Sequence, residues 1–371
     1  MWLLILLAVS AAPPAAERFE VLAHRAEQAR AAAQNAQAIQ LYRQALQLKP
    51  SWTEGNWALA SLLYQTNDYP GACKALDRLI AAVPNSGAAY MLRGLSEFEE
   101  RDFAAALLDL RRGSTLGIAN DPPLESSARE HLIALLTRAG EFDEAAAELT
   151  RAIQAGGSRE IFGVLAGLIA LHKPMFASQV PPQDQELVSL AGAAMFEALA
   201  RHPEQAKEAF STLVVRYPNA EYVHYLYGSF LLTSSPDAGR NELKTELAHF
   251  PQDELARLQL IFDYLKSDDV AAALPLAETA VEQQPSSYKA HHALGRCLIA
   301  SGQLDRGIRE LELSRKLQPN SPQTRLALAS AYAKAGRKAE ADRERAEFLR
   351  LRRSLDGQTP GEEASVPARP Q

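Results

Sequence analysis

The feature that most constrains the fold of this chain is a repeat with a period of 34 residues, seen in the steps from Ala26 to Ala60 and from Ala60 to Gly94. Small or aliphatic residues recur at about this spacing in the middle of one predicted helix, at Ala26, Ala60, Gly94, Ile133, Ala194, Gly228, Ile261, Gly295 and Ala329. A second small column runs through Ala38, Ala72, Ala106, Ala145, Ala206, Ala273, Gly307 and Ala341, and proline closes most units at Pro50, Pro84, Pro218, Pro251, Pro285 and Pro319. Such a period indicates a solenoid of stacked supersecondary units and not a single globular core.

Each unit is predicted to hold two helices. The pattern leaves about 14 residues for each helix, which is marginal for an isolated helix in water, so packing against neighbours must supply most of its stability. Turn residues separate the two helices, as at Asn67, Gly140, Gly302 and Gly336. No segment shows sustained alternation of apolar and polar residues, so we expect no β-sheet. The sequence therefore predicts an all-α protein.

The best-formed unit spans residues 288–321. Its apolar, small and turn positions are Leu294, Gly295, Leu298, Gly302, Ile308, Leu311, Leu317 and Pro319. In this order they resemble the tetratricopeptide repeat (TPR) family, although Gly307 and Ser314 replace the usual alanines. The resemblance recurs in residues 19–52, 53–86, 87–120, 126–157, 187–220, 221–253, 254–287 and 322–355. It implies about nine repeats in a right-handed α-solenoid, the TPR superhelix.

Two interruptions divide the repeats. Residues 120–125 are interpreted as a lengthened linker, and residues 158–186 do not fit the repeat. Within the latter, the apolar stretch 161–171 predicts a buried helix, and in the following loop we expect Met175 and Phe176 to pack into the solenoid and to set the angle between two arms. The predicted organisation is an apolar segment at 1–16, about four repeats at 17–157, the non-repeat segment at 158–186, about five repeats at 187–355 and a disordered tail at 356–371.

The amino-terminal stretch from Trp2 to Ala12 is apolar apart from Ser10. It is too short to cross a bilayer, which needs about 20 residues. It matches the hydrophobic region of a signal peptide with a plausible cleavage site after Ala11, although no Lys or Arg precedes the apolar run. We expect export to a bacterial-type periplasm or cell envelope; an uncleaved membrane tether and a cytoplasmic location remain alternatives.

Composition and motifs argue against nucleic-acid binding and catalysis. The formal net charge is -6, which does not resemble the basic surface of a nucleic-acid binder. No H-E-x-x-H, P-loop, G-x-S-x-G or C-x-x-C motif occurs, and the adjacent His291 and His292 point in different directions on a helix. We therefore predict no enzyme, no cofactor and no metal. Cys73 and Cys297 lie in distant repeats, too far apart for a disulfide, and are interpreted as small buried hydrophobic residues.

By register with the family, the first helices of the repeats line a concave groove that receives peptides or partner helices. The predicted partner-binding residues of this groove are Trp57, Tyr64, Met91, Leu95, Phe98, Tyr222, Tyr225, Leu258, Phe262 and Arg296. Aromatic residues at helical spacing also fill cores. Each helix, however, already has a separate core column, such as Leu59 and Leu63, and surplus aromatic residues on a concave face are typical of interaction hot spots.

The resemblance also predicts which partners to expect. Chaperone-binding members carry Lys, Asn and Arg at positions that here hold Trp57, Ser61 and Glu130, so we expect no carboxylate clamp for a chaperone tail. The predicted function is a non-enzymatic scaffold that binds peptides or partner segments of other proteins in its groove, in the cell envelope. The alternative is a cytoplasmic or membrane-tethered regulatory adaptor.

Overall fold

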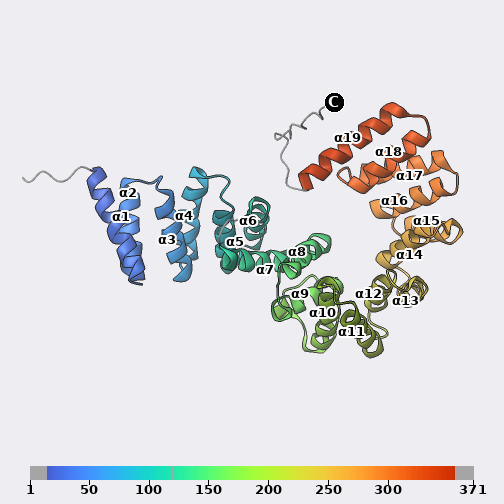
Figure 1. The fold of residues 1–371 in the computed structure, drawn as a ribbon, viewed down its shortest axis with the longest axis horizontal. Coiled ribbons are helices and arrows are strands. Elements are labelled where there is room, and N and C mark those ends of the chain that lie inside the picture. The colour runs from blue at the N-terminus through green and yellow to red at the C-terminus, as the bar shows by residue number, and fades with distance from the viewer. Residues whose placement is uncertain (1–14, 118–120, 356–371) are drawn as a thin grey trace, which may run out of the picture. The chain divides into compact units, whose positions relative to one another are not determined.

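The computed structural model describes residues 15–117 and 121–355. Over these residues the chain is all-α, and the regular elements are helices, as the sequence predicts (Figure 1). The predicted disordered tail and residues 1–14 of the apolar amino-terminal segment lie outside the described residues, while Ala15 and Ala16 begin the first helix.

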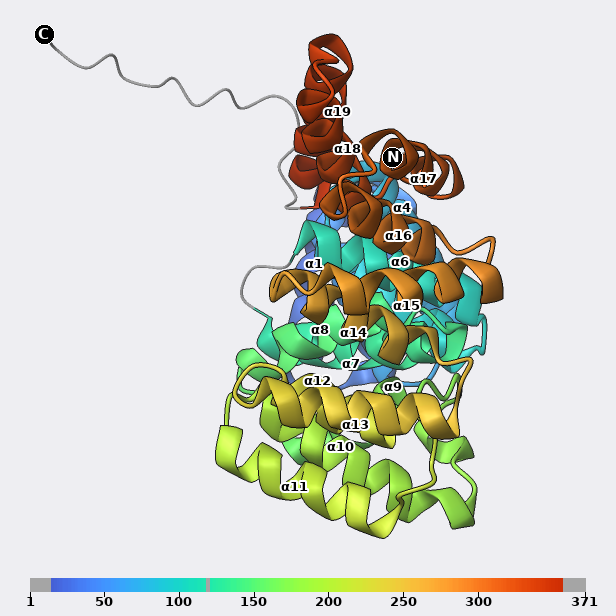
Figure 2. The same cartoon turned by 90° about the vertical axis from the view of Figure 1, so that its right-hand side faces the viewer.

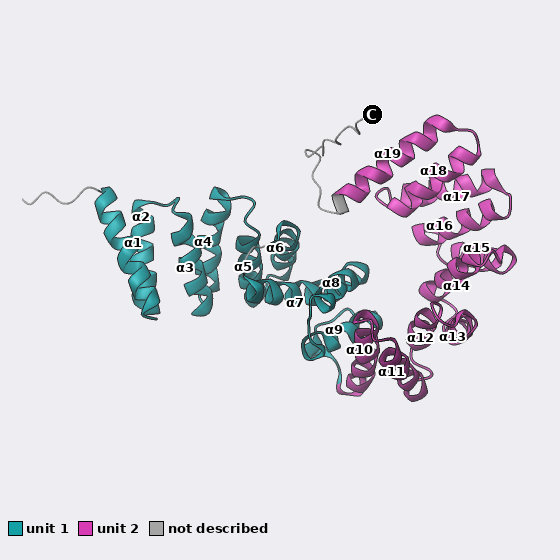
Figure 3. Ribbon diagram, in the orientation of Figure 1, with its two compact units in different colours: residues 1–181 teal, residues 182–371 magenta. Residues whose placement is uncertain are grey.

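Contacts divide the chain into two compact units, residues 1–181 and 182–371 (Figure 3). The helices of unit 1 are α1 (Ala15–Ala31), α2 (Asn35–Leu48), α3 (Thr53–Gln65), α4 (Tyr69–Ala82), α5 (Gly87–Glu99), α6 (Phe103–Leu116), α7 (Pro122–Ala139), α8 (Phe142–Gln154), α9 (Arg159–Ala170) and the short 3-10 helix η1 (Ala177–Gln179). The predicted domain boundaries, and the role of Phe176 in setting an angle between arms, remain predictions.

Unit 2 contains the remaining elements. They are the 3-10 helix η2 (Pro182–Asp184), α10 (Gln185–Leu199), α11 (Pro203–Arg216), α12 (Val223–Leu231), α13 (Pro236–His249), α14 (Glu254–Lys266), α15 (Val270–Gln283), α16 (Tyr288–Ala300), α17 (Leu304–Leu317), α18 (Pro322–Lys334) and α19 (Lys338–Leu355). Consecutive helices pack as antiparallel pairs, from α1 with α2 to α18 with α19, and α9 has no such second helix (Figure 1 and Figure 2). The nine predicted repeats are thus nine helical pairs within the described residues.

The two columns of small residues lie where the helices of a pair cross. Ala26, Ala38, Ala60 and Ala72 are completely buried, at 0% exposure. In the best-formed repeat the approach is closer: a Cβ atom added to Gly295 would lie 2.9 Å from the carbonyl oxygen of Gly307. Small side chains at these positions therefore let two backbones touch, which explains why the columns hold alanine and glycine.

Side-chain caps and left-handed turn residues fix where the helices begin. Asp68 accepts a hydrogen bond from the backbone N–H of Gly71 at 3.0 Å, and Asn67 before it has φ 61°. Asp121 caps α7 in the same way, with Leu124 N–H donating at 3.2 Å, and Pro122 follows as the first helical residue. The interpretation of residues 120–125 as a linker is therefore wrong for residues 122–125, which form the first turn of α7.

A polar residue six positions after the closing proline joins the first helix to the turn before it. Asn56 donates to the carbonyl of Pro50 at 2.9 Å, and the Nε2 atom of His291 lies 3.0 Å from the carbonyl oxygen of Pro285. Such contacts join Asn56 with Pro50, His224 with Pro218, Arg257 with Pro251, His291 with Pro285 and Arg325 with Pro319. Each gives a hydrogen-bond donor to a carbonyl oxygen that follows the end of the preceding helix and has no donor within it.

Helix α9 is less buried than the sequence predicts. Its inner side chains are buried, with Phe162 at 2% exposure, but Ile161 and Val164 are 44% and 40% exposed. The expectation of a helix buried all round is thus wrong, because α9 lies at one end of unit 1 and packs on α7 and α8 along one side. The two cysteines are free; Cys297 is buried as expected, whereas Cys73 is only half-buried.

Candidate partner-binding groove

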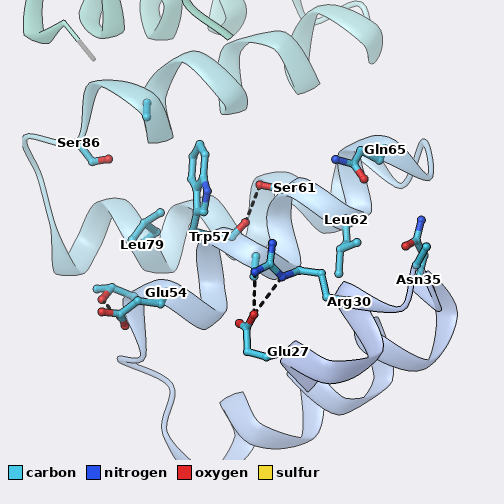
Figure 4. Close-up of a pocket in the computed structure, with 14 residues that line it drawn as sticks. Glu27, Arg30, Asn35, Glu54, Trp57, Ser61, Leu62, Gln65, Leu79 and Ser86 are labelled. Atoms are coloured by element: carbon cyan, nitrogen blue, oxygen red, sulfur yellow. Dashed lines mark hydrogen bonds and ion pairs between the residues drawn. The ribbon is translucent and has the colours of Figure 1, made fainter. Parts of the chain in front are cut away.

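An open pocket of about 710 Å³ lies around Trp57 in unit 1 and is lined mainly by the first helices α1 and α3 (Figure 4). Trp57 on α3 is half-buried, and Ser61 one turn later donates its hydroxyl hydrogen to the Trp57 carbonyl at 2.9 Å. On the wall formed by α1, Arg30 donates to Glu27 at 2.7 Å. The pocket therefore offers an aromatic face beside an ion pair, a combination that suits an extended peptide with both apolar and polar groups.

The other groove residues predicted in this part of unit 1 divide between surface and core. Tyr64 is half-buried and makes an edge-on contact with Tyr69, with ring centroids 5.5 Å apart. Met91 and Leu95 are buried, at 3% and 2% exposure. Met91 lies against α6, since a Cβ atom added to Gly113 would come within 2.6 Å of its Cγ. A partner would meet Trp57 and Tyr64 but not these two side chains.

A second pocket of unit 1, of about 670 Å³, lies where α5, α7 and α9 face η1. Phe98 on α5 contacts the ring of His131 on α7 edge-on, with centroids 4.6 Å apart. The exposed side chains of Ile161 and Val164 on α9 extend the apolar wall. Phe176, in the segment that follows α9, also contacts Phe98, with ring centroids 5.8 Å apart. Phe98 is thus the predicted groove residue around which the most aromatic contacts gather in unit 1.

A cluster of acidic residues surrounds Arg93 and includes Glu97, the residue before Phe98. Arg93 donates to Asp109 at 2.9 Å and to Asp77 at 2.7 Å, while its Nε atom is 3.8 Å from the carboxylate of Glu97. One Glu97 oxygen is buried without a hydrogen-bond partner. Burial first, and then the negative charge of Asp109, raises the pKa of Glu97 to about 7.

This pKa predicts that unit 1 loses stability as pH rises from about 5 to 8. Glu97 binds its proton more tightly in the folded chain than in the unfolded one, so its favourable contribution is complete below the ordinary value of 4.5 and disappears as pH rises through about 7. Glu97→Gln should therefore raise the free energy of unfolding by about 1 kcal/mol at pH 8 and change it less at pH 5. Urea titrations at both pH values measure this difference, with the exposed Glu99→Gln as the control; an equal effect of Glu97→Gln at both pH values would contradict it.

In unit 2, Tyr222 and Tyr225 lie at the beginning of α12. Their rings are half-buried and their centroids are 6.4 Å apart in an edge-on contact. Tyr222 precedes the helix with φ 69°, in the left-handed region. The buried carboxylate of Glu246 holds both residues, because it accepts the backbone N–H of Tyr222 at 2.7 Å and that of Tyr225 at 3.0 Å. The tyrosine pair is therefore positioned by α13.

The remaining predicted residues lie on α14 and α16. Phe262 is half-buried, and the guanidinium carbon of the exposed Arg296 lies 5.4 Å from its ring centroid. His292 is buried beside them, and burial, followed by the charge of Arg296, lowers its pKa to about 4, so its imidazole is neutral at pH 7. Leu258, at 5% exposure, belongs to the core. Phe262 and Arg296 together present a cation stacked on an aromatic ring.

Sequence reasoning did not identify Phe103, His131, Arg138, Ile161 and Val164 as neighbours of Phe98. Their spacing from Phe98 in the chain is irregular, and Phe176 belongs to the segment that interrupts the repeat. A signal was present only in the first helices, since Glu130 and Ala134, which line this pocket, occupy the same register in α7 as Met91 and Leu95 do in α5.

Neither a metal site nor a membrane span is found in the described part of the chain. Residues 15–117 and 121–355 contain no group of three or more His, Cys, Asp or Glu side chains arranged to hold a metal ion. Within the same ranges, every helix is too short or too polar to pass through a bilayer.

Fold and pockets together define an α-helical repeat protein. A family description of the tetratricopeptide repeat matches residues 29–95 and 264–323. The first match covers α2 to most of α5 in unit 1, and the second covers α15 to the beginning of α18 in unit 2. The chain therefore contains tetratricopeptide repeats in both units, which supports an interaction scaffold for other proteins.

Solved structures of similar fold include several of MamA. One is MamA 41-end from Desulfovibrio magneticus RS-1, which is 19% identical with a TM-score of 0.41 and covers 46% of this chain and 98% of that chain. Another, MamA AMB-1, is 22% identical with a TM-score of 0.37 and covers 43% of this chain and 96% of that chain. At this level the likeness concerns the helical repeat fold alone. A comparison with curated proteins found no match.

Proposed function

We propose that this protein is a non-enzymatic scaffold whose first helices bind extended segments of partner proteins. The observation that carries the proposal is the pair of pockets in unit 1, of about 710 and 670 Å³, which lie on successive first helices and are lined by Trp57 and Phe98. Half-buried aromatic residues that border open pockets offer large contact areas to a partner at a small cost in side-chain entropy. Phe262 stacked under Arg296 offers a similar surface in unit 2.

The chemistry of these surfaces favours peptides and proteins over other ligands. Trp57 lies beside the ion pair of Arg30 with Glu27, and acidic and basic side chains both border the Phe98 pocket. A chain with a net charge of -6 does not provide the basic surface that a phosphate backbone needs. We further propose that the groove has no clamp for a chaperone carboxylate, since Trp57 and Ser61 occupy the corresponding positions in α3.

The proposed location is the periplasm or cell envelope, and it is supported by the apolar stretch from Trp2 to Ala12. The alternative is a cytoplasmic or membrane-tethered regulatory adaptor. Mass spectrometry of the native amino terminus distinguishes the two: a chain beginning after Ala11 supports export, and an intact Met1 on soluble protein contradicts it.

The binding function is tested by removing the aromatic side chains in pairs. Trp57→Ala/Phe98→Ala in unit 1 and Tyr225→Ala/Phe262→Ala in unit 2 are compared in crosslinking and affinity capture from the native host. At least one pair should reduce recovery of a partner tenfold or more. Two hot-spot residues contribute about 2 kcal/mol each to binding, so their joint loss is more than sufficient for this decrease. Leu108→Ala/Val215→Ala is the matched control, because these apolar residues are 66% and 80% exposed on second helices. Folded pairs that retain every partner would place the binding surface elsewhere.

A further inference from the structure

One aromatic site in unit 1 already has an occupant, and that occupant is part of the same chain. The ring of Phe176 lies 5.1 Å from that of Phe103 and 5.8 Å from that of Phe98, measured between centroids. The guanidinium carbon of Arg138 lies 5.2 Å from the Phe176 centroid and 4.7 Å from the Phe103 centroid. A single phenylalanine thus contacts α5, α6 and the end of α7 at once.

The segment that carries Phe176 is largely exposed, and Met175 and Phe176 are the residues of 174–179 that are half-buried. Pro174, Ala177, Ser178 and Gln179 are exposed. The hydrogen bonds of its backbone are local: Gln179 N–H donates to the Phe176 carbonyl at 2.9 Å, and Phe176 N–H donates to the Gln179 side chain at 3.0 Å. Such a segment folds on itself and inserts one side chain into a neighbouring surface, which is how a short peptide ligand binds a groove.

The pocket remains open beside the inserted ring. Residues 176–179 form one of its walls, and Ile161 and Val164 of α9 form another, both exposed to more than a third. Charges of both signs border it, from Arg101 and Arg138 and from Glu130 and Glu160. Because the charges around the pocket are mixed, a ligand is selected by its aromatic ring and not by its net charge.

We propose that Phe98, Phe103 and Arg138 form a phenylalanine-binding site that residues 174–179 occupy as an internal ligand. A partner segment that presents a phenylalanine must displace Phe176 before it reaches this part of the groove. The inference rests on the proposed groove function and deepens it, since it names the chemistry of the partner and the contact that opposes it. A covalently attached ligand competes at an effective concentration in the millimolar range. The affinity of the intact chain for an external segment is therefore the affinity of the open site multiplied by the fraction of sites that are open.

The test uses the full chain and its own segment as a probe. A fluorescein-labelled peptide of residues 172–181 is titrated against wild type and Phe176→Ala by fluorescence anisotropy. Phe176→Ala should bind it at least tenfold more tightly than wild type, and the same peptide with alanine at position 176 should bind at least tenfold more weakly. Equal binding to both chains, or binding to neither, overturns the proposal.

Second variants locate the site. Phe176→Ala/Phe98→Ala should lose the peptide. Adding Arg138→Gln to Phe176→Ala changes one further side chain, which is exposed, and should weaken peptide binding severalfold. Phe176→Ala/Trp57→Ala is the matched control and should bind as Phe176→Ala does. No external partner enters this experiment, so its failure can be distinguished from failure of the scaffold function. If the protein captures partners but does not bind the peptide, only the proposal of an internal ligand is wrong. If it binds the peptide but captures partners equally well without Trp57 and Phe98, partners bind at another surface.

Discussion

Gly239→Val should destabilise unit 2 by about 3 kcal/mol, because a side chain there would collide with backbone atoms. Gly239 on α13 crosses α12 so closely that an added Cβ would lie 2.8 Å from the carbonyl oxygen of Gly228 and 2.8 Å from the backbone nitrogen of Leu232. Backbone atoms cannot rotate away as a flexible side chain does, so the two helices must separate. Hydrogen exchange on α12 and α13, together with a urea titration, measures the loss.

The matched control for this glycine is Gly163 on α9. The nearest atom to an added Cβ at Gly163 is the Cγ atom of Arg159, at 3.3 Å, which belongs to a flexible side chain. Alanine is favoured over glycine inside a helix by about 1 kcal/mol, so Gly163→Ala should stabilise unit 1 slightly. If Gly239→Val left unit 2 as stable as wild type, the close crossing of α12 and α13 would be wrong.

Glu246→Ala should cost unit 2 about 3 kcal/mol, since it leaves two backbone N–H groups without their acceptor. The Glu246 carboxylate is completely buried and accepts from the N–H groups of Tyr222 and Tyr225. The same hydrogen bond helps to hold Tyr222 in its left-handed conformation. Without the Glu246 carboxylate, the rest of the structure must maintain this conformation. The expected result is a lower urea midpoint and faster exchange of the first amides of α12.

Asn241→Ala on the same helix is the control for this carboxylate. Asn241 is exposed on α13, and its replacement should change the free energy of unfolding by less than about 0.5 kcal/mol. Equal effects of Glu246→Ala and Asn241→Ala would show that the carboxylate does not position the tyrosine pair.

The fold follows from the sequence because one period places small residues at most of the helix crossings. Gly295 and Gly307 lie where that period predicts, and their backbones touch. Gly239 was missed for a physical reason: counted from Gly228 it comes one residue earlier than Gly307 does from Gly295, so a fixed spacing points to its neighbour Arg240. The first turn of α7 was missed because residues 120–125 exceed the length of the repeat and were interpreted as a linker, although Pro122 at a helix start needs no hydrogen-bond donor.

The candidate site was less predictable than the fold. Register along a helix shows which side chains share a face, but not how far the neighbouring helix covers that face. Met91 and Leu95 share the inward face of α5 with Phe98 and are nevertheless buried, whereas Phe98 is half-buried beside an open pocket. The approach of Phe176 to Phe98 depends on how the chain turns after α9, where the repeat pattern gives no register.

The contacts between the closing prolines and the first helices allow each junction between repeats to be adjusted separately. Asparagine forms this contact at Pro50, histidine at Pro285 and arginine at Pro319, three side chains of different length and stiffness that reach the same kind of carbonyl. Each of these side chains belongs to the beginning of a first helix, so exchanging one changes a single position there and leaves the preceding helix unchanged. Evolution, or an engineer, therefore has one position in each repeat that carries such a contact at which the junction with the preceding repeat can be altered on its own.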